Sequence, residues 1–284
     1  MRRYLVTGAK GWLAGELDRR LAAFPDEYVL DRVSVRGDEW LCADWSKYDG
    51  VFHFASVVYG DDSESVNAEL SYRVAEKCSH DNVPWLLVMS SFSVYGAERC
   101  PDLLVDSTTC MSPATPYGRS KLASEEAAAK ALGGSETRLA IVRAPLVYGP
   151  GQRKGNFPAL ISLSRSVPFF PATDNKRSMI FSQNLCELCR LLADSNAEGV
   201  FLPQDAAYHD TGRLVRALAE RQGRHVVLVP KTVKLVHFLS GVSEKLGKLF
   251  GNARYRFEDD KIPYRYRIVS NEDALDETVD GVAE

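Results

Sequence analysis

The sequence has no long hydrophobic run, and none of its apolar segments approaches the roughly 18 residues that a membrane-spanning helix needs. Met1-Arg2-Arg3 leads into a short apolar segment that ends at Gly8, without the longer apolar region and cleavage site of a secretory signal. Positive charge is not in excess, since 35 Lys and Arg residues face 38 Asp and Glu residues and the net charge is -3. We therefore expect a cytoplasmic protein without membrane association and without a nucleic-acid partner, which would require a strongly basic surface.

A metal-ligand pattern is also missing. The six cysteines are scattered along the chain, and only Cys186 and Cys189 form a Cys-x-x-Cys pair. Both fall in the apolar stripe of residues 184–192, which has the pattern of an amphipathic helix. Since no second Cys or His pair lies at zinc spacing, we predict buried core thiols and no bound metal.

Apolar runs alternate with helical patterns through the first 150 residues. The strand-like runs are apolar nearly throughout, as burial on both faces of a sheet requires. This order predicts an α/β fold, a doubly wound, mostly parallel sheet of Rossmann type with helices on both faces. We predict strands at 3–7, 28–36 (one strand or a bent pair), 51–55, 84–91 and 138–143, and helices at 12–23, 63–79 and 116–132.

A glycine-punctuated turn follows the first predicted strand. Between a strand and a helix, such glycines let the backbone approach a pyrophosphate, which the exposed N–H groups and the helix N-terminus stabilise. An ordinary turn into a helix would give the same pattern, so the turn needs support from elsewhere in the chain. The residues that we expect around the pyrophosphate are Gly8, Lys10, Gly11, Trp12 and Leu13.

The kind of dinucleotide depends on the end of the second predicted strand. An acid about 20 residues past the first glycines normally hydrogen-bonds the adenosine ribose, whereas an arginine there suits the 2′-phosphate of NADP. If 28–31 is the strand, Asp31 is the ribose ligand. If 32–36 is the strand, it ends at Arg36 and NADP becomes the cofactor. Both residues remain candidates.

Tyr117 and Lys121 stand four residues apart in the predicted helix at 116–132, so their side chains share one helix face. The pKa of an unperturbed tyrosine is about 10. A nearby cation favours the phenolate, which makes Tyr117 a candidate proton-transfer group. Ser91 ends an apolar strand at the carboxyl edge of the predicted sheet, where open parallel sheets bind ligands. A solvated helix face and a capping serine are the alternatives, and the glycine turn upstream argues against them.

Four spaced motifs occur in order along the first two thirds of the chain. They are Gly8-x-x-Gly11-x-x-Ala14, the segment Ser90-Ser91-Phe92-Ser93-Val94-Tyr95-Gly96, Tyr117-x-x-x-Lys121, and Arg143-x-x-x-Val147-Tyr148-Gly149-Pro150-Gly151. Together they resemble the extended short-chain dehydrogenase/reductase family, in its NAD-dependent epimerase/dehydratase branch that acts on nucleotide sugars. The resemblance implies a bound NAD, with NADP as the alternative, a nucleotide-sugar substrate, and a homodimer that pairs through helices of the large domain.

The resemblance also implies roles for individual residues. Tyr117 would be the acid/base, Lys121 would hold the nicotinamide ribose and lower the Tyr117 pKa, and Ser91 would hydrogen-bond the reacting oxygen. Asp44 resembles the acid that meets the adenine, with a turn aspartate as the alternative. Further contacts are implied for the cofactor at Phe54, Ala55 and Ser56, and for the substrate at Ser91 and Arg177. Ser93 is a further candidate for substrate binding, and Asn156 and Arg177 could help to neutralise a substrate diphosphate.

The residues after the strand-end serine favour one reaction over another. The family's 4,6-dehydratases place an Asp-Glu pair there to eliminate water, whereas this chain has Phe92 and Ser93. We therefore predict a nucleotide-sugar epimerase that acts at C4 by transient hydride transfer. An NAD(P)H-dependent keto-sugar reductase is the alternative, and a non-catalytic dinucleotide-binding regulator is the alternative from another class.

The regular alternation ends after Gly151, where loops, short strand-like segments and clustered cations begin. We predict a dinucleotide-binding domain at 1–150, to which 179–204 returns, and a smaller mixed α/β substrate-binding region at 151–178 and 205–284. No long Gly/Ser linker separates them, so they should share one folded unit. Residues 232–250 have an amphipathic pattern with several lysines, for which packing into the small region is expected over a membrane surface.

Overall fold

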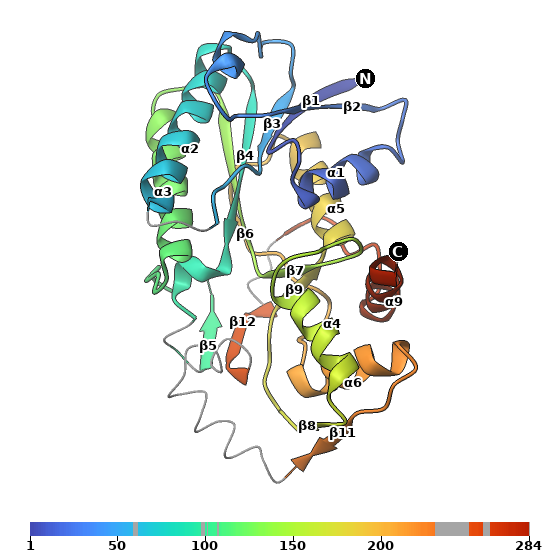
Figure 1. The fold of residues 1–284 in the computed structure, drawn as a ribbon. Helices are drawn as coiled ribbons and strands as arrows, with labels where there is room; N and C mark the ends of the chain where they lie inside the picture. The colour runs from blue at the N-terminus through green and yellow to red at the C-terminus, as the bar shows by residue number, and fades with distance from the viewer. Residues whose placement is uncertain are drawn as a thin grey trace.

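The computed structural model describes residues 1–283 apart from 59–61, 98–99, 101, 107, 231–249 and 258–261. A central sheet is wrapped by helices, and a smaller region continues from the carboxyl edge of that sheet (Figure 1). The amphipathic stretch expected at 232–250 lies outside the described residues, except for Phe250. None of the described helices is long and apolar enough to cross a membrane.

The central sheet has six parallel strands, which lie in the order β10 (Gly199–Phe201), β6 (Arg138–Ala144), β4 (Trp85–Ser91), β3 (Gly50–His53), β1 (Arg2–Thr7) and β2 (Tyr28–Val33). The middle strand β4 sends Leu87 and Met89 into one core and Leu86 and Val88 into the core on the opposite face. A strand buried on both faces needs an apolar residue at nearly every position, which explains its continuous apolar run. The predicted doubly wound α/β fold is confirmed.

Helices cover both faces of the sheet (Figure 1). α1 (Trp12–Leu21) and α5 (Ser182–Asp194) contribute to the core on one face. α2 (Ser63–His80) and α3 (Pro116–Ala131) pack against each other and cover the opposite face. Each helix therefore buries one apolar stripe against the sheet.

The Cys-x-x-Cys pair lies on the buried stripe of α5. Cys186 and Cys189 are both in the core beneath α1, and burial raises the pKa of both thiols. They are the core side chains that the sequence predicted. Within the described ranges, no group of three or more His, Cys, Asp or Glu side chains is arranged to hold a metal ion.

The second predicted strand, 28–36, is shorter than expected. β2 ends at Val33, which pairs with Thr7, the last residue of β1. β1 ends at this pair, so the residues after Val33 have no residue of β1 to pair with. The chain turns at Gly37, whose φ of +74° lies in the left-handed region, into the short 3₁₀ helix η1 (Glu39–Cys42). Arg36 therefore lies in a loop and not at the end of a strand.

The smaller region has its own hydrophobic core. The core lies between three helices and two short parallel strands, and it includes the stacked rings of Tyr148 and Phe157. These elements are α4 (Asn156–Ser166), α6 (Thr211–Arg221), α9 (Asn271–Ala283), β7 (Leu146–Tyr148) and β9 (Met179–Phe181).

Two further pairs of parallel strands involve the smaller region. β8 (Phe169–Pro171) pairs with β11 (Val227–Val229), and β5 (Asp102–Val105) pairs with β12 (Asn252–Tyr255). β5 lies between β4 and α3 in the chain, whereas β12 lies near the end of the sequence. The β5–β12 pair therefore attaches the C-terminal part of the chain to the part that contains the central sheet.

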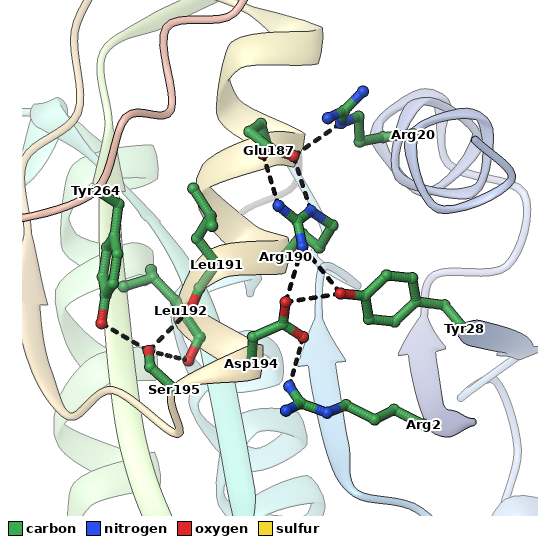
Figure 2. A network of polar contacts seen from close by, with 10 residues as sticks. All are labelled: Arg2, Arg20, Tyr28, Glu187, Arg190, Leu191, Leu192, Asp194, Ser195 and Tyr264. Atoms are coloured by element: carbon green, nitrogen blue, oxygen red, sulfur yellow. Dashed lines mark hydrogen bonds and ion pairs between the residues drawn. The ribbon is translucent and has the colours of Figure 1, made fainter. Parts of the chain in front are cut away.

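A polar network fixes α5 to the elements that open the chain (Figure 2). The Asp194 carboxylate accepts hydrogen bonds of 2.6 Å from Tyr28 of β2 and 2.8 Å from Arg190. The Glu187 carboxylate accepts from the same Arg190 and from Arg20 of α1, each at 2.8 Å. α5 follows the first part of the smaller region in the chain, and this network packs it back onto α1 and β2.

Candidate active site

Ser91 is the last residue of β4, at the carboxyl edge of the central sheet. Its hydroxyl oxygen accepts a hydrogen bond of 3.2 Å from the Ser93 N–H. This bond caps the 3₁₀ helix η2 (Phe92–Tyr95), which begins directly after the strand. The chain therefore turns at Ser91 and presents its hydroxyl at the sheet edge.

The first turn of α3 fixes the position of Tyr117. The Thr115 hydroxyl accepts a hydrogen bond of 3.1 Å from the Gly118 N–H, and Pro116 is the first helical residue, where its missing N–H costs nothing. Tyr117 follows, half-buried, with its phenol near enough to the Ser91 hydroxyl for the serine to lower the pKa of the phenol. The helix cap thus holds the phenol against the end of β4.

Lys121 lies one helical turn after Tyr117. Its ammonium is buried, donates a hydrogen bond of 3.0 Å to the Met89 carbonyl, and lies 5.9 Å from the centre of the Tyr117 ring. The fold therefore gathers Ser91, Tyr117 and Lys121 in one place. A phenol, a hydroxyl and a cation that lie close together are the components of a proton-transfer site.

Burial controls the ionisation of this site. It raises the pKa of the Tyr117 phenol, and the neighbouring Ser91 hydroxyl opposes this effect in part. It lowers the pKa of Lys121 to about 8, against the opposing effect of the Glu125 carboxylate. The lowered Tyr117 pKa that the resemblance implied is therefore not found in the chain by itself, because the ammonium is directed to the Met89 carbonyl and desolvation dominates.

We expect Lys121→Met to stabilise the protein at neutral pH and to lose this advantage at alkaline pH. The Lys121 pKa is about 8 in the folded chain and 10.5 in an exposed lysine, so between these values the unfolded chain binds more protons. The free energy of unfolding of the wild type therefore rises with pH in this window. The difference between variant and wild type should shrink by about 2 kcal/mol from pH 7.0 to 9.5, as measured by urea denaturation. A difference that stays constant with pH would contradict the desolvation of Lys121.

A buried ion pair lies behind the Lys121 side chain. The Glu125 carboxylate accepts hydrogen bonds from Arg143 Nη2 at 2.7 Å and from the Ser90 hydroxyl. Arg143 also donates to the Tyr95 phenol at 2.7 Å, and these partners raise its pKa further. Sequence reasoning missed this pair, although Glu125 is one turn past Lys121 and Arg143 opens the fourth motif.

The glycine turn has the geometry that a dinucleotide site requires. Gly8 has a φ of +81°, and a Cβ there would lie 3.1 Å from the Ala55 nitrogen. The Gly11 N–H donates to the Gly8 carbonyl at 2.7 Å, and α1 starts at the next residue. Gly11 has no side chain to occupy the first N–H groups of α1, so they can face an anion. Leu13 packs into the core and anchors the start of the helix.

The loop after β3 adjoins this turn and offers an unsatisfied polar group. Phe54, Ala55 and Ser56 follow β3, and the Ser56 hydroxyl is buried without a hydrogen-bond partner in the part of the chain that the structure describes. A buried hydroxyl of this kind is costly unless a ligand or water satisfies it. The turn and the loop together fit the pyrophosphate and adenosine of NAD or NADP.

The two candidate ligands of the adenosine ribose are Asp31, within β2, and Arg36, in the loop after it. The Asp31 carboxylate accepts hydrogen bonds from Arg3 and from Tyr48 at 2.9 Å, and Tyr48 belongs to the core beneath α2 and α3. Arg36 is exposed in the loop after β2. β2 contains the predicted strand 28–31 but continues to Val33, and it ends three residues before Arg36, so its end matches neither alternative.

Three other residues were predicted to contact the cofactor, namely Lys10, Trp12 and Asp44. Lys10 is exposed within the turn. The Trp12 indole donates to the Pro150 carbonyl at 2.8 Å, which ties the turn to the start of the smaller region. Asp44 is exposed, and hydrogen bonds from Ser46 lower the pKa of its carboxyl. Asp44 therefore has the turn geometry that was its alternative interpretation.

A cavity of about 230 Å³ lies in the smaller region, between β7, α4, β9 and α6. Its walls are mostly apolar, and its polar lining comes from Asn156, Arg177, His209 and Thr211. β7 begins two residues after β6, whose last residue pairs with Ser91, so the cavity adjoins the catalytic edge of the sheet. This volume suits one part of a larger ligand.

The polar residues of the cavity come from distant parts of the chain. The Arg177 N–H donates to the His209 carbonyl at 3.0 Å, and the Arg177 guanidinium donates to the Gly251 carbonyl at 2.9 Å. Of the predicted substrate residues, Asn156 and Arg177 line the cavity, whereas Ser93 lies beside Ser91. His209 was missed, because only the bridge to Arg177 brings it there.

The sequence matches the model of the NAD dependent epimerase/dehydratase family over residues 4–201. The chain belongs to this family, whose members are extended short-chain dehydrogenase/reductases, a class of nicotinamide-dependent enzymes. UDP-glucose 4-epimerase from Vibrio cholerae is 30% identical over 197 residues, which cover 66% of this chain and 59% of the relative. The match thus spans about three fifths of the relative's length.

Solved structures of this class have the same fold. UDP-glucose 4-epimerase from Thermus thermophilus, in complex with NAD, has a TM-score of 0.74 at 18% identity and covers 99% of both chains. RMD from Pseudomonas aeruginosa, complexed with NADPH, has a TM-score of 0.78 at 18% identity and covers 100% of both chains. At this level of identity, the likeness is one of fold.

Proposed function

We propose that the protein is a nucleotide-sugar epimerase that acts at C4 by transient hydride transfer to a bound nicotinamide dinucleotide. The observation that carries this proposal is that Ser91, Tyr117 and Lys121 lie close together at the same sheet edge as the glycine turn. The Vibrio cholerae relative, a UDP-glucose 4-epimerase, favours a UDP-hexose as the substrate.

Each residue of the site has a separate task in this reaction. Tyr117 takes the proton of the sugar 4-hydroxyl and later returns it, while Ser91 holds the same oxygen by a hydrogen bond. A bound nicotinamide supplies the group that accepts a hydride from C4 and gives it back. Lys121 would hold the nicotinamide ribose.

The residues after Ser91 support epimerisation over dehydration. Phe92 is buried with its ring 4.7 Å from that of Tyr255, measured between ring centres. Ser93 belongs to η2 and donates its N–H to Ser91. Neither side chain can serve as the carboxylic acid or carboxylate that removal of water requires. Epimerisation needs only the phenol and return of the hydride to the other face of the keto sugar.

The cavity in the smaller region supports a role in substrate binding. A guanidinium such as Arg177 matches phosphate oxygens, and the apolar walls suit a base. We assign residues 1–150 and 179–204 to the dinucleotide and residues 151–178 and 205–284 to the nucleotide sugar. A cytoplasmic location and a homodimer are part of this proposal.

Product analysis tests the reaction directly. The purified protein is incubated with UDP-glucose, UDP-galactose and their N-acetylated forms, and the products are resolved by NMR. We expect interconversion of C4 epimers without net consumption of dinucleotide. Products that form only with stoichiometric oxidation of NADH or NADPH would support a keto-sugar reductase instead. Dinucleotide binding without any turnover would support the non-catalytic regulator.

Gly118→Ala should slow this reaction even though alanine favours helices. A Cβ at position 118 would lie 2.5 Å from the Ser93 carbonyl oxygen, so α3 must move away from η2. Tyr117 then separates from Ser91, and we expect kcat to fall about 10- to 100-fold. Gly15→Ala is the matched control, because a Cβ there meets none of the described atoms within 4 Å. It should keep full activity, and equal losses in both variants would contradict the argument.

A further inference from the structure

Glu125 is a buried acid to which the proposed reaction gives no task. It lies on α3 four residues after Lys121, and only 4% of its side chain is exposed. Residues four apart are neighbours on a helix surface, so Tyr117, Lys121 and Glu125 follow one another along one side of α3. A phenol, an ammonium and a carboxylate therefore occupy successive turns of the helix.

These turns of α3 contact consecutive residues at the end of β4. The Lys121 ammonium donates to the backbone carbonyl that precedes Ser90, and the Ser90 hydroxyl donates to the Glu125 carboxylate. Tyr117 lies near the hydroxyl of the next residue, Ser91. Because Ser90 and Ser91 are adjacent, a group that fixes Ser90 also sets the position of the Ser91 hydroxyl relative to the phenol.

Arg143 holds the Glu125 carboxylate in this position. Its Nε donates to Oε1 at 3.1 Å and its Nη2 donates to Oε2 at 2.7 Å. Arg143 is the residue of β6 that pairs with Ser90 in the sheet, and it also donates to the Tyr95 phenol at the end of η2. The carboxylate is thus anchored to the strand beside Ser91 and to the helix that follows it.

Glu125 is also the anion that acts on Lys121. Its charge raises the pKa of the ammonium, against the larger effect of burial. In the described part of the chain, the other ionisable groups around Lys121 are neutral or positive at pH 7. Burial and the charge of Lys121 lower the pKa of His53 on β3 to about 3, burial raises that of Tyr117, and Arg143 is paired with Glu125 itself. Without Glu125, the buried ammonium has no counter-charge.

We infer that Glu125 is a positioning residue of the proposed reaction, which fixes Ser91 through Ser90 and is the counter-charge of the Lys121 ammonium. The inference rests on the proposed function and adds a residue that acts only through its neighbours. A carboxylate that served the fold alone could be replaced, together with its arginine, by apolar side chains without loss of turnover. Glu125 cannot be replaced in this way, because an apolar side chain neither accepts from Ser90 nor carries a charge.

The double variant Arg143→Met/Glu125→Leu separates positioning from stability. Both charges of the pair are removed, so the variant should fold with most of the wild-type stability, as verified by urea denaturation. We nevertheless expect kcat for epimerisation of the UDP-sugar at pH 7 to fall about 10- to 100-fold, since small displacements of reacting groups have effects of this size. Wild-type turnover in the folded double variant would overturn the inference.

Titration of Lys121 provides a readout that does not depend on turnover. Full-length protein labelled with ¹³C at the lysine ε-carbons is titrated by NMR without substrate, and the Lys121 signal is assigned by its absence in Lys121→Met. The wild-type midpoint is expected at about 8. Glu125→Gln should lower it by about one pH unit, because loss of a nearby opposite charge disfavours the ammonium. The alkaline limb of the kcat profile should move to lower pH with it.

Glu126→Gln is the matched control, because it removes the charge of an exposed acid at the next position of α3. It should change neither the Lys121 midpoint nor kcat. A midpoint that stays constant in Glu125→Gln, or that falls equally in Glu126→Gln, would overturn the counter-charge role. If Glu125→Gln does not fold, the double variant provides the titration, with the same fall expected. If the midpoint falls but the wild type epimerises no nucleotide sugar, the proposed function fails and the counter-charge role stands.

Discussion

Tyr117→Phe should lower turnover of the nucleotide sugar by about 10²- to 10⁴-fold, the range typical of a lost general acid–base group. The ring remains and continues to pack on Lys121, so dinucleotide affinity should change by less than about threefold. Epimerisation rates and dinucleotide titrations on the same preparation measure both quantities.

Tyr264→Phe is a matched control for that experiment. The Tyr264 phenol donates a hydrogen bond of 2.6 Å to Ser195, at the end of α5 and away from the strand ends that carry the site (Figure 2). Removal of this hydroxyl should leave turnover unchanged. If Tyr117→Phe retained turnover, or lost dinucleotide binding to the same extent as turnover, the proton-transfer role of Tyr117 would be excluded.

Arg143→Met should reduce the free energy of unfolding by about 3–5 kcal/mol, because it leaves a charged carboxylate buried without its partner. The side chains of Arg143 and Glu125 are 11% and 4% exposed, so water cannot replace the lost contacts. Urea denaturation at neutral pH measures the change. The double variant Arg143→Met/Glu125→Leu should recover most of the loss, since no unpaired charge remains.

An exposed ion pair provides the comparison for this effect. Arg119 and Glu64 form a contact of 3.2 Å between α3 and α2, with both side chains close to half exposed. Arg119→Met should cost less than about 1 kcal/mol, because solvent screens such pairs. If the losses in Arg143→Met and Arg119→Met were equal, the buried pair behind Lys121 would not have the stabilising role that its burial indicates.

The sequence predicted those features that depend on local patterns. Continuous apolar runs identified β1, β3, β4 and β6, because strands buried on both faces tolerate few polar residues. The spacing of Tyr117 and Lys121 predicted a shared helix face, and the capped start of α3 produces it. The order of these elements was sufficient for the fold, since consecutive strand and helix patterns restrict the topology strongly.

Features that depend on contacts between distant residues were beyond the sequence. The end of β2 is set by the length of its partner β1, so the choice between Asp31 and Arg36 could not be made from the strand itself. The pairing of Glu125 with Arg143 and the approach of His209 to Arg177 arise only in the folded chain. The direction of the Tyr117 pKa shift was wrong for the same reason, because the spacing revealed the cation but not the burial.

The network around Arg190 restricts how this enzyme can recombine with its relatives. α5 covers the same sheet face as α1 and is linked to it by the ion pair of Arg20 with Glu187. The half of the molecule assigned to the dinucleotide therefore consists of two separate stretches of the gene. A single crossover near residue 150 would combine α1 and β2 of one parent with α5 of the other, and would mismatch Arg20 with Glu187 and Tyr28 with Asp194. Exchange of substrate specificity between relatives therefore requires crossovers on both sides of residues 179–204.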